Sequence, residues 1–360
     1  MDNGSTDGTA EAISIRFPTV RVLRLEENRG FTGGIMHAVA NSWAPYAAFL
    51  NNDAVPDTGW LRALVDAIRT AQDDVIAIGG RITDPGGELA DFVGGVMTFD
   101  GHGFQPGFRK PLGAVEEPDD RAEIFFACGG NMIVKRRPFI EIGGFDDDFF
   151  AYLEDVDFGW RAWLSGWRIL YSRDASVRHK SSATSERFGN FERGVLFERN
   201  AIQTVIKNFD DDHFTRLSGS LFLTLLHRLH RYVLDRNEGT ESLRAPFRGI
   251  ERRGNEPTML QRLARKLLGR PAGIRISDDL SRMQFRAIEW LFQNEDRLIA
   301  KRETVQSRRR RPDREILERF PLCYVPTYHG DEALMNSALF RLLRPDVSSV
   351  DRKLEEIIGR

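Results

Sequence analysis

Residues 46–53 read YAAFLNND, and this stretch decides the fold class of the chain. Its first five residues form a short apolar run, which indicates a buried strand. Three polar residues, Asn51, Asn52 and Asp53, follow at the carboxyl end of that strand. Open α/β sheets bind their ligands beyond the carboxyl ends of their strands, so the stretch predicts both an α/β sheet and the position of a site.

The segments on either side alternate between strand-like and helix-like patterns. Residues 19–25 alternate apolar and polar side chains, which indicates a strand, and residues 35–42 follow as a predicted helix. Downstream, residues 60–70 have an amphipathic helical pattern and residues 75–79 form another apolar run. This β-α-β-α-β order predicts an α/β fold with a largely parallel sheet.

The first nine residues, MDNGSTDGT, have the composition of a tight polar turn. Residues 10–17 follow as a predicted helix, with Asp7 or Thr9 as its N-cap. Turns of this kind usually connect two elements, yet the sequence shows no element before this one.

The pattern changes near residue 210. Before it, residues 84–121 are rich in Gly, Pro and Asp and are expected to form an excursion or a hairpin, and residues 125–171 read as strand, helix, loop, helix and strand. After it, strand signals almost vanish and helical runs alternate with Arg-rich stretches. We therefore expect an α/β domain over residues 1–210 and a helical, Arg-rich region over residues 211–360.

The composition is typical of a soluble globular protein, with 41% hydrophobic and 29% charged residues among 360. Two cysteines exclude a disulfide framework and a cysteine-rich metal cluster, so a reducing compartment is expected. The longest apolar run, near LSGSLFLTLL, is about half the length that spans a bilayer.

The net charge of −2 hides an asymmetry between the two halves. Residues 1–160 contain 26 acidic and 13 basic residues, whereas residues 161–360 contain 27 acidic and 38 basic residues. The acidic half argues against nucleic acid as a partner there and suits a site that holds a cation. The basic half could face an anionic surface. Alternatively, it is an ordinary charged surface.

Two acidic positions are candidates for chemistry. Asp53 could hold a hard divalent cation whose other ligands are phosphate oxygens, or it could cap the next helix. Glu154, Asp155 and Asp157 place three carboxylates within four residues, between aromatic segments that could form the walls of a pocket. Alternatively, this cluster is an acidic first helical turn that the helix dipole favours.

A histidine and a glycine pair complete the set of candidates. His179 follows the strand predicted at residues 168–171, and a neutral imidazole is a common metal ligand, although a lone histidine is often structural. Gly129 and Gly130 would let the backbone approach a ligand closely, or they form an ordinary turn.

Taken in order, these segments form a set that resembles the family 2 glycosyltransferases with the GT-A fold, including rhamnosyltransferase-like bacterial enzymes. The segments that carry the resemblance are DNGSTDGT at 2–9, NRGFTGG at 28–34, LNND at 50–53, GG at 129–130, RRPFIEIGGFD at 136–146, FFAYLEDVD at 149–157, GWR at 159–161, and a His followed by SATS. The resemblance covers residues 1–210. It implies a Rossmann-like, mostly parallel sheet with a C-terminal helical extension.

The resemblance implies a nucleotide-sugar site with a divalent metal, Mg²⁺ or Mn²⁺. The donor-binding positions that match the family are Asp2, Asn3, Gly33, Asn52, Asp53, Gly129 and Gly130. Asp2 would contact the base, and the two glycines would line the donor sugar. Asp53 would be the metal ligand of a degenerate D-x-D motif in which Asn51 replaces the first acid, with His179 as a second metal or diphosphate ligand.

The resemblance also implies the chemistry of transfer. Asp155 would be the catalytic base that takes a proton from the acceptor hydroxyl, and Glu154 and Trp160 would touch the acceptor. A metal held by Asp53 would stabilise charge on the leaving diphosphate. One displacement with one base predicts an inverting glycosyltransferase.

The expected partners follow from the same resemblance. The donor would be a dTDP- or UDP-linked sugar, and the acceptor a cell-surface polysaccharide or a lipid-linked glycan; no nucleic acid is expected. We expect a cytoplasmic protein, with possible contact at the inner face of the plasma membrane. Residues 217–234 form an apolar helical stripe that could lie on a membrane or pack against the catalytic domain. The sequence leaves the oligomeric state open.

In the resembling family a strand, a helix and a second strand precede the DNGSTDGT turn. Met1 stands where the family usually has Val, so we expect that the sequence begins inside this fold and lacks its first strand or strands. Such a chain could be a catalytically inactive, glycosyltransferase-like interaction protein, which is the alternative to an enzyme. A nucleotidyltransferase shares the nucleotide and metal logic, but the order of the motifs fits it poorly.

Overall fold

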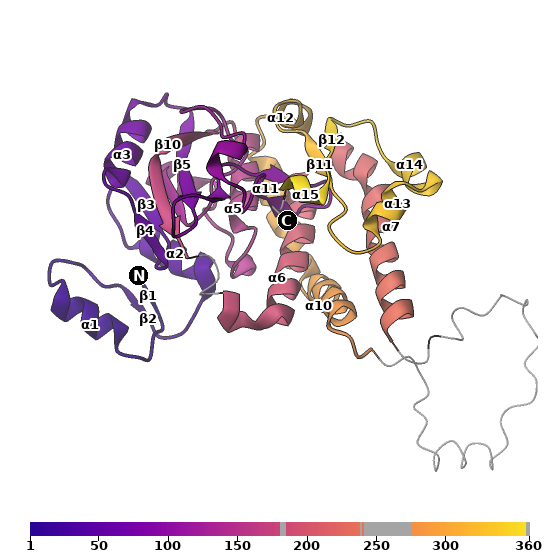
Figure 1. The fold of residues 1–360 in the computed structure, drawn as a ribbon, viewed down its shortest axis with the longest axis horizontal. Helices are drawn as coiled ribbons and strands as arrows, with labels where there is room; N and C mark the ends of the chain where they lie inside the picture. The colour runs from indigo at the N-terminus through magenta and orange to yellow at the C-terminus, as the bar shows by residue number, and fades with distance from the viewer. Residues whose placement is uncertain (181–184, 238–239, 241–275, 358–360) are drawn as a thin grey trace, which may run out of the picture.

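The computed structural model describes residues 1–180, 185–237, 240 and 276–357; part of the SATS segment, residues 181–184, lies outside this set. Figure 1 shows a sheet covered by helices in the first part of the chain, with a mainly helical part beside it. The α/β class expected from the sequence is confirmed.

The central sheet has six strands, in the order β3-β9-β5-β10-β4, with β6 paired to β5. The strands are β3 (Tyr46–Leu50), β4 (Ala54–Pro56), β5 (Val75–Thr83), β6 (Ala90–Phe92), β9 (Asn131–Lys135) and β10 (Arg168–His179). Strands β3, β5 and β10 run in one direction, but β9 runs the opposite way between β3 and β5, and β4 is antiparallel to β10. The prediction of a largely parallel sheet is therefore wrong, because the chain returns through the sheet in β9 and β4.

The strand β3 lies where the YAAFLNND stretch predicts a strand. It is less buried than expected, because it is an edge strand and only Phe49 among its residues is buried. Its antiparallel partner β9 aligns Leu50 with Asn131. The polar residues that follow β3 therefore lie beside the start of β9.

The helices of this part of the chain form where the sequence predicts them, with one shifted boundary. They are α1 (Thr9–Arg16), α2 (Gly30–Ala40), α3 (Trp60–Thr70), α4 (Arg136–Glu141) and α5 (Glu154–Leu164). Helix α2 begins five residues before its predicted start, inside a glycine-rich segment of low helix propensity. The side chain of Asn3 donates to the Gly30 carbonyl (2.8 Å) and Asn28 accepts from the Gly30 amide (2.9 Å), which stabilises this first turn.

The first residues form a small separate unit. Strand β1 (Asp2–Asn3) pairs in parallel with β2 (Arg24–Leu25), and the pair lies outside the central sheet with α1 beside it (Figure 1). The predicted strand at residues 19–25 is therefore confirmed only at its end. Residues 84–121 contain β6 and a hairpin of β7 (Val96–Met97) and β8 (Gly103–Phe104), which confirms the predicted excursion.

From residue 185 on, the described residues are predominantly helical, which agrees with the helical extension expected from the sequence. The helices are α6 (Ser185–Asn208), α7 (Asp211–Arg236), α10 (Asp279–Gln293), α11 (Glu295–Ser307), α12 (Asp313–Arg319), α13 (Asp331–Met335), α14 (Ala338–Leu343) and α15 (Leu354–Ile357). A short parallel pair, β11 (Leu322–Tyr324) with β12 (Ser349–Asp351), is the strand structure that the sequence pattern did not reveal.

One hydrophobic core joins the two halves. Trp160 and Trp163 of α5 belong to the same buried cluster as Phe209, Tyr324 and Phe340. Residue 210 therefore separates two patterns of sequence but not two independent cores.

Helix α7 turns a different face inward from the one its apolar stripe predicts. Its buried residues include Leu217, Ser220 and Thr224, whereas Phe222 and Leu226 are 61% and 62% exposed. Among the described residues, no helix is long and apolar enough to cross a membrane.

Candidate active site

Strand pairing brings Asp53 and His179 together. Strands β10 and β4 are antiparallel, with His179 opposite Ala54, so the last residue of β10 lies beside Asp53. The amide of Lys180 donates to the Asp53 carbonyl (3.0 Å), which holds the two chain segments in this register. The His179 Nε2 lies 3.1 Å from Asp53 Oδ1. Two predicted site residues, 126 positions apart, thus meet in one site.

A third residue of this group, Asp91 on β6, was not predicted from the sequence. Its Oδ2 lies 2.8 Å from His179 Nδ1, on the opposite side of the ring from Asp53. Asp91 sits in the Gly- and Pro-rich excursion, where the only signal is its position between two apolar residues, Ala90 and Phe92. These two neighbours are buried, so Asp91 faces the other side of the short strand.

The two carboxylates favour a charged imidazole. Burial opposes the positive charge on His179, but the hydrogen bonds and charges of Asp91 and Asp53 outweigh that effect and raise its pKa. The same negative charge would attract a divalent cation bound to Asp53. That cation would bind the Nε2 atom of a neutral imidazole. A carboxylate oxygen is a suitable ligand for Mg²⁺ or Mn²⁺, and an imidazole nitrogen beside it suits a transition metal such as Mn²⁺ better than Mg²⁺, so these residues fit the implied metal.

A second group of possible metal ligands is structural. Asp210, His213 and Asp313 have ligand atoms within 4.8 Å of one another. The carboxylate oxygens of both aspartates already accept hydrogen bonds, because each aspartate accepts from the backbone amide of the other and Asp210 also caps α7. This group ties the starts of α7 and α12 together.

Asp155 lies at the start of α5 with both carboxylate oxygens in use. Oδ1 accepts from the Val156 amide (2.9 Å) and Oδ2 is 3.4 Å from the Gly129 amide. Burial raises the pKa of Asp155 to about 6, although these amide contacts act against the increase. The group is therefore mostly ionised at neutral pH and close to the range that suits a general base.

Glu154 is the protonated member of the acidic pair. Its side chain is buried, and burial together with the charge of Asp155 raises its pKa to about 8. Its Oε2 has no hydrogen-bond partner among the described residues. Two adjacent carboxyl groups with separated pKa values can supply one base and one donor.

The charges of both the acidic pair and Asp91 act on Cys128. Burial raises the pKa of its thiol, and the charges of Asp155, Asp91 and Glu154 raise it further. The thiol therefore lies within electrostatic range of both the acidic pair and the carboxylate that holds His179.

The glycine pair is required by close packing. A Cβ on Gly129 would lie 2.9 Å from the Phe31 ring, and one on Gly130 would lie 2.6 Å from Asn51 Nδ2. The backbone N–H of Asn51 also donates to the Gly130 carbonyl (3.1 Å). The pair thus brings the end of β3 next to the start of β9.

The remaining predicted donor residues lie on other elements. Asp2 is buried on β1 and pairs with Arg24 (3.4 Å), and Asn3 holds the start of α2 through its amide. Gly33 lies in α2 against the side chain of Arg29. Asn52 is exposed beyond the end of β3.

The structure contradicts one predicted residue. Trp160 is fully buried, donates to Asp313 Oδ1 (3.0 Å) and packs edge-on against Phe209 at 4.4 Å. Five residues along α5 place it about 140° around the helix from Asp155. The prediction that Trp160 touches the acceptor is therefore wrong, because its side chain faces the shared core.

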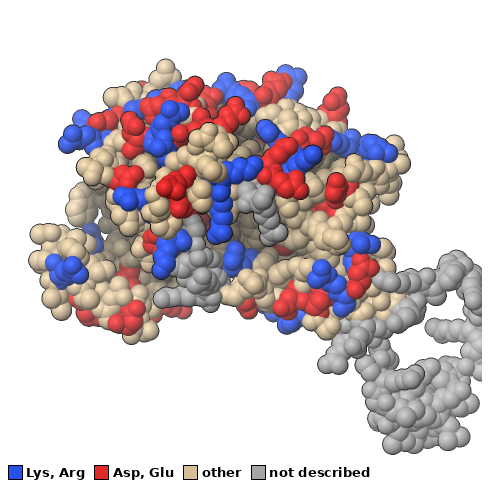
Figure 2. Space-filling model, in the orientation of Figure 1, with Lys and Arg blue, Asp and Glu red and all other residues tan. Residues whose placement is uncertain are grey.

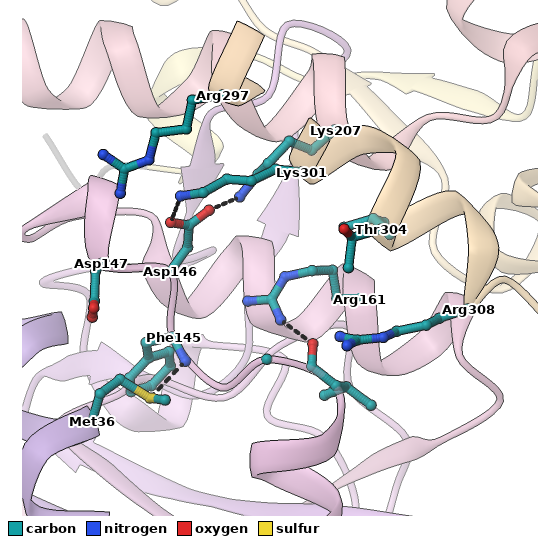
Figure 3. A pocket seen from close by; sticks show the side chains of 13 residues that line it. Met36, Phe145, Asp146, Asp147, Arg161, Lys207, Arg297, Lys301, Thr304 and Arg308 are labelled. Carbon is teal, nitrogen blue, oxygen red and sulfur yellow. Dashed lines mark hydrogen bonds and ion pairs between the residues drawn. The ribbon is translucent and has the colours of Figure 1, made fainter. Parts of the chain in front are cut away.

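A separate cavity of about 330 Å³ holds none of the predicted site residues. Its lining residues are Met36, Ile142, Gly143, Phe145, Asp146, Asp147, Arg161, Lys207, Arg297, Lys301, Thr304, Val305 and Arg308. Figure 3 shows Lys207 and Lys301 reaching the carboxylate of Asp146 from two directions. The positive charges here are therefore partly neutralised by ion pairs that join the helical half to the loop before α5.

Residues 1–143 match the family described as glycosyl transferase family 2. An N-acetylglucosaminyl-diphospho-decaprenol L-rhamnosyltransferase of Mycobacterium tuberculosis is 30% identical over 208 residues, which cover 52% of this chain and 67% of that relative. The O-antigen biosynthesis protein RfbC of Myxococcus xanthus is 29% identical over 200 residues, 51% of this chain and 15% of that protein.

Solved structures are more distant. A mannosyltransferase from Pyrobaculum calidifontis, solved with GDP-Man and Mn²⁺, is 16% identical with a TM-score of 0.40, over 82% of this chain and 76% of that one. The sequence matches carry the assignment: this chain is a glycosyltransferase with the GT-A fold, and it belongs to glycosyl transferase family 2.

Proposed function

We propose that the protein is an inverting, metal-dependent glycosyltransferase that moves a sugar from a nucleoside diphosphate sugar to a hydroxyl group. One observation carries the proposal: Asp53 and His179 lie 3.1 Å apart, and the Cys128 thiol is influenced by the charges of both Asp91, which binds His179, and Asp155, a carboxylate with a pKa of about 6. The first pair suits a metal–diphosphate, and the carboxylate suits proton removal from an acceptor.

Asp53 and His179 Nε2 would hold the metal, and Asp91 would orient His179 by binding Nδ1. When bound, a divalent metal offsets the negative charge that builds on the leaving diphosphate. Asn51 replaces the first acid of the usual motif, so the chain itself supplies a single carboxylate at this point. The diphosphate oxygens would complete the ligand set.

Asp155 would accept the proton of the acceptor hydroxyl as that oxygen attacks the anomeric carbon. The sugar–phosphate bond breaks on the opposite face, so one displacement inverts the configuration. Glu154, protonated at neutral pH, could donate a hydrogen bond to the acceptor. The role of Glu154 is supported by its buried carboxyl oxygen without a partner among the described residues.

The donor site would include Asp2, Asn3, Gly33, Asn52, Asp53, Gly129 and Gly130. Asp2 would contact the base, whereas Asn3 and Gly33 would act by shaping the start of α2. A dTDP- or UDP-linked donor is proposed because the Mycobacterium relative is named a rhamnosyltransferase, and its name also contains a diphospho-decaprenol acceptor. We accordingly propose a lipid-linked or polysaccharide acceptor, a cytoplasmic location and contact with the inner face of the membrane.

Residues 1–210 would carry the catalytic site and residues 211–360 would support it through the shared core. The test is product analysis with purified protein, Mg²⁺ or Mn²⁺, UDP- or dTDP-sugars and a lipid diphosphate glycan acceptor. We expect glycosyl transfer with inverted anomeric configuration, which is lost in Asp155→Asn. Transfer that persists at wild-type turnover in Asp155→Asn would overturn the assigned base. Binding of a protein partner with no sugar or nucleotidyl transfer would favour the inactive interaction protein instead.

A further inference from the structure

The loop that leads into the acidic pair has an unusual backbone. Phe150, Tyr152 and Leu153 have φ angles of 62°, 71° and 63°. Residues other than glycine rarely adopt this region, and they stay in it only where the surrounding structure enforces the strain. Glu154 and Asp155 follow directly. The position of the proposed base therefore depends on whatever stabilises this loop.

One buried side chain binds most of the loop. Asn200 of α6 is fully buried, and its Nδ2 donates to the carbonyl oxygens of Phe149 (3.0 Å), Ala151 (2.9 Å) and Tyr152 (2.8 Å). An amide nitrogen has two hydrogens, so at least one is shared between two of these oxygens. These carbonyl groups would otherwise lose a hydrogen bond away from water, which is costly.

The orientation of this amide is determined by its neighbours on α6. Asn200 Oδ1 accepts from Gln203 Nε2 (3.2 Å) and from Arg199 Nε (3.1 Å), so Nδ2 must face the loop. Arg199 adds its own bonds from Nη2 to the carbonyls of Asp148 and Phe149. Its guanidinium stacks over Trp290 of α10 at 4.7 Å, which holds it in place.

Two further contacts constrain the loop. Asp146, just before it, is paired with Lys207 of α6 and Lys301 of α11 (Figure 3). Within the loop, Gly30 of α2 approaches so closely that a Cβ there would lie 2.3 Å from the Phe150 carbonyl oxygen. These contacts limit how far the loop can relax, and Asn200 bonds three of its carbonyl groups.

We infer that Asn200 is a positioning residue for Asp155, a role that rests on the proposed function. Its amide holds the carbonyls of residues 149–152 in the strained conformation that presents Asp155 at the start of α5. An aspartate at this position would turn a carboxylate oxygen toward three carbonyl oxygens and would repel them. The inference also gives helix α6 a role in catalysis, because Asn200 of α6 supplies the amide.

The first measurement compares Asn200→Ala with Asn208→Ala. Both asparagines are fully buried on α6, but Asn208 bonds Asp157 and not the loop. Because a displacement of about 1 Å can cost about a hundredfold in rate, we expect kcat to fall between tenfold and a hundredfold in Asn200→Ala. The KM for the donor and the affinity for metal should stay within about twofold of wild type. An equal loss of kcat in Asn208→Ala would overturn the inference.

The second measurement isolates the strain. Tyr152→Gly and Tyr152→Ala both remove the ring, but only glycine accepts a φ of 71° without cost. In the Asn200→Ala background we expect Tyr152→Gly to have a kcat several-fold above that of Tyr152→Ala. In the wild-type background the two should differ less, since Asn200 enforces the loop. Equal rates in the Asn200→Ala background would contradict the inference.

A third measurement needs no turnover. Hydrogen–deuterium exchange of a peptide covering residues 149–156 should become faster in Asn200→Ala and stay at the wild-type rate in Asn208→Ala. Unchanged exchange in a folded Asn200→Ala protein would overturn the inference, whether or not sugar transfer is found. If wild type transfers no sugar but exchange changes as expected, the proposed function fails while the loop support stands. Should Asn200→Ala not fold, Asn200→Ser, which keeps one donor, takes its place in all three measurements.

Discussion

At the scale of single residues, two carboxyl groups of the site differ in their pKa values. Asp155 and Glu154 are neighbours in the chain, Glu154 buried and Asp155 partly buried, and their pKa values are about 6 and about 8. Amide contacts to Asp155 favour its charge, whereas the charge of Asp155 disfavours ionisation of Glu154. The family resemblance predicts Asp155 as the base, and these contacts support that proposal because they leave Asp155 the more readily ionised of the two.

The pH dependence of transfer should report Asp155. The base must be ionised, so kcat/KM should rise with pH through about 6 and level off above it. A profile of kcat/KM between pH 5 and pH 8 in the wild-type protein measures this. A flat profile through pH 6 would contradict the role of Asp155.

The stability of the protein should reflect Glu154. Its folded pKa lies above the ordinary value, so its contribution is complete at acid pH and is lost as pH rises through about 8. Glu154→Gln removes this titration and should retain more stability at alkaline pH than wild type, by on the order of a few kcal/mol. Urea unfolding of both proteins at pH 5.5, 7 and 8.5 tests the sign. Parallel loss of stability in the two proteins would show that Glu154 does not titrate as described.

At the scale of elements, the proposed metal site depends on strand pairing. The antiparallel pairing of β10 with β4 puts His179 next to Asp53, and the pairing of β6 with β5 brings Asp91 to the other ring nitrogen of His179. The resemblance identified Asp53 and His179 from their positions in ordered motifs. It did not identify Asp91, because the excursion around β6 has no periodic pattern.

Removal of the Asp91 carboxylate should weaken metal binding. Carboxylate partners of ligating histidines orient the ring, and their loss typically costs about 10–100-fold in affinity. We expect Asp91→Asn to weaken Mn²⁺ binding, measured by calorimetry in the presence of nucleoside diphosphate, by about tenfold. Asp57→Asn, which alters an exposed carboxylate paired with Arg178, is the matched control. Equal affinity of Asp91→Asn and wild type would assign Asp91 to structure alone.

At the scale of the whole molecule, the opposite charges of the two halves partly neutralise each other. Lys301 pairs with Asp146 and Arg319 pairs with Glu123 across the boundary near residue 210. Figure 2 shows basic and acidic side chains intermixed over the face in view. The excess of basic residues in residues 161–360 is therefore used in part within the molecule, and it does not by itself indicate an anionic partner.

The exposed apolar residues of α7 are the better candidates for membrane contact. Phe222 and Leu226 are 61% and 62% exposed, and Leu342 of α14 is 79% exposed. Helix α14 packs close to the same face, since a Cβ on Gly219 would lie 3.3 Å from Leu343. An apolar helix face binds at a membrane surface in proportion to the apolar area it buries.

We expect wild-type protein to float with vesicles that contain anionic lipid and Phe222→Ser/Leu226→Ser to float less. Ile15→Ser, an exposed apolar position on α1 in the other part of the molecule, serves as the control. Equal flotation of all three proteins would remove α7 from the membrane contact. Both substitutions are at exposed positions and should change stability by about 0.5 kcal/mol or less.

The sequence by itself determined the family, the α/β class and the candidate site residues, because these depend on local patterns and on the order of short motifs. Asp53, His179 and Asp155 are proposed in this way, and the helices over residues 60–70 and 10–17 follow from local patterns. The tertiary structure alone decided that β9 runs antiparallel, that Trp160 faces the core, that Asp91 binds His179, and that Asn200 bonds the loop before Asp155. A periodic pattern records which face of an element is apolar, but the element that covers that face is chosen by packing between residues far apart in the chain.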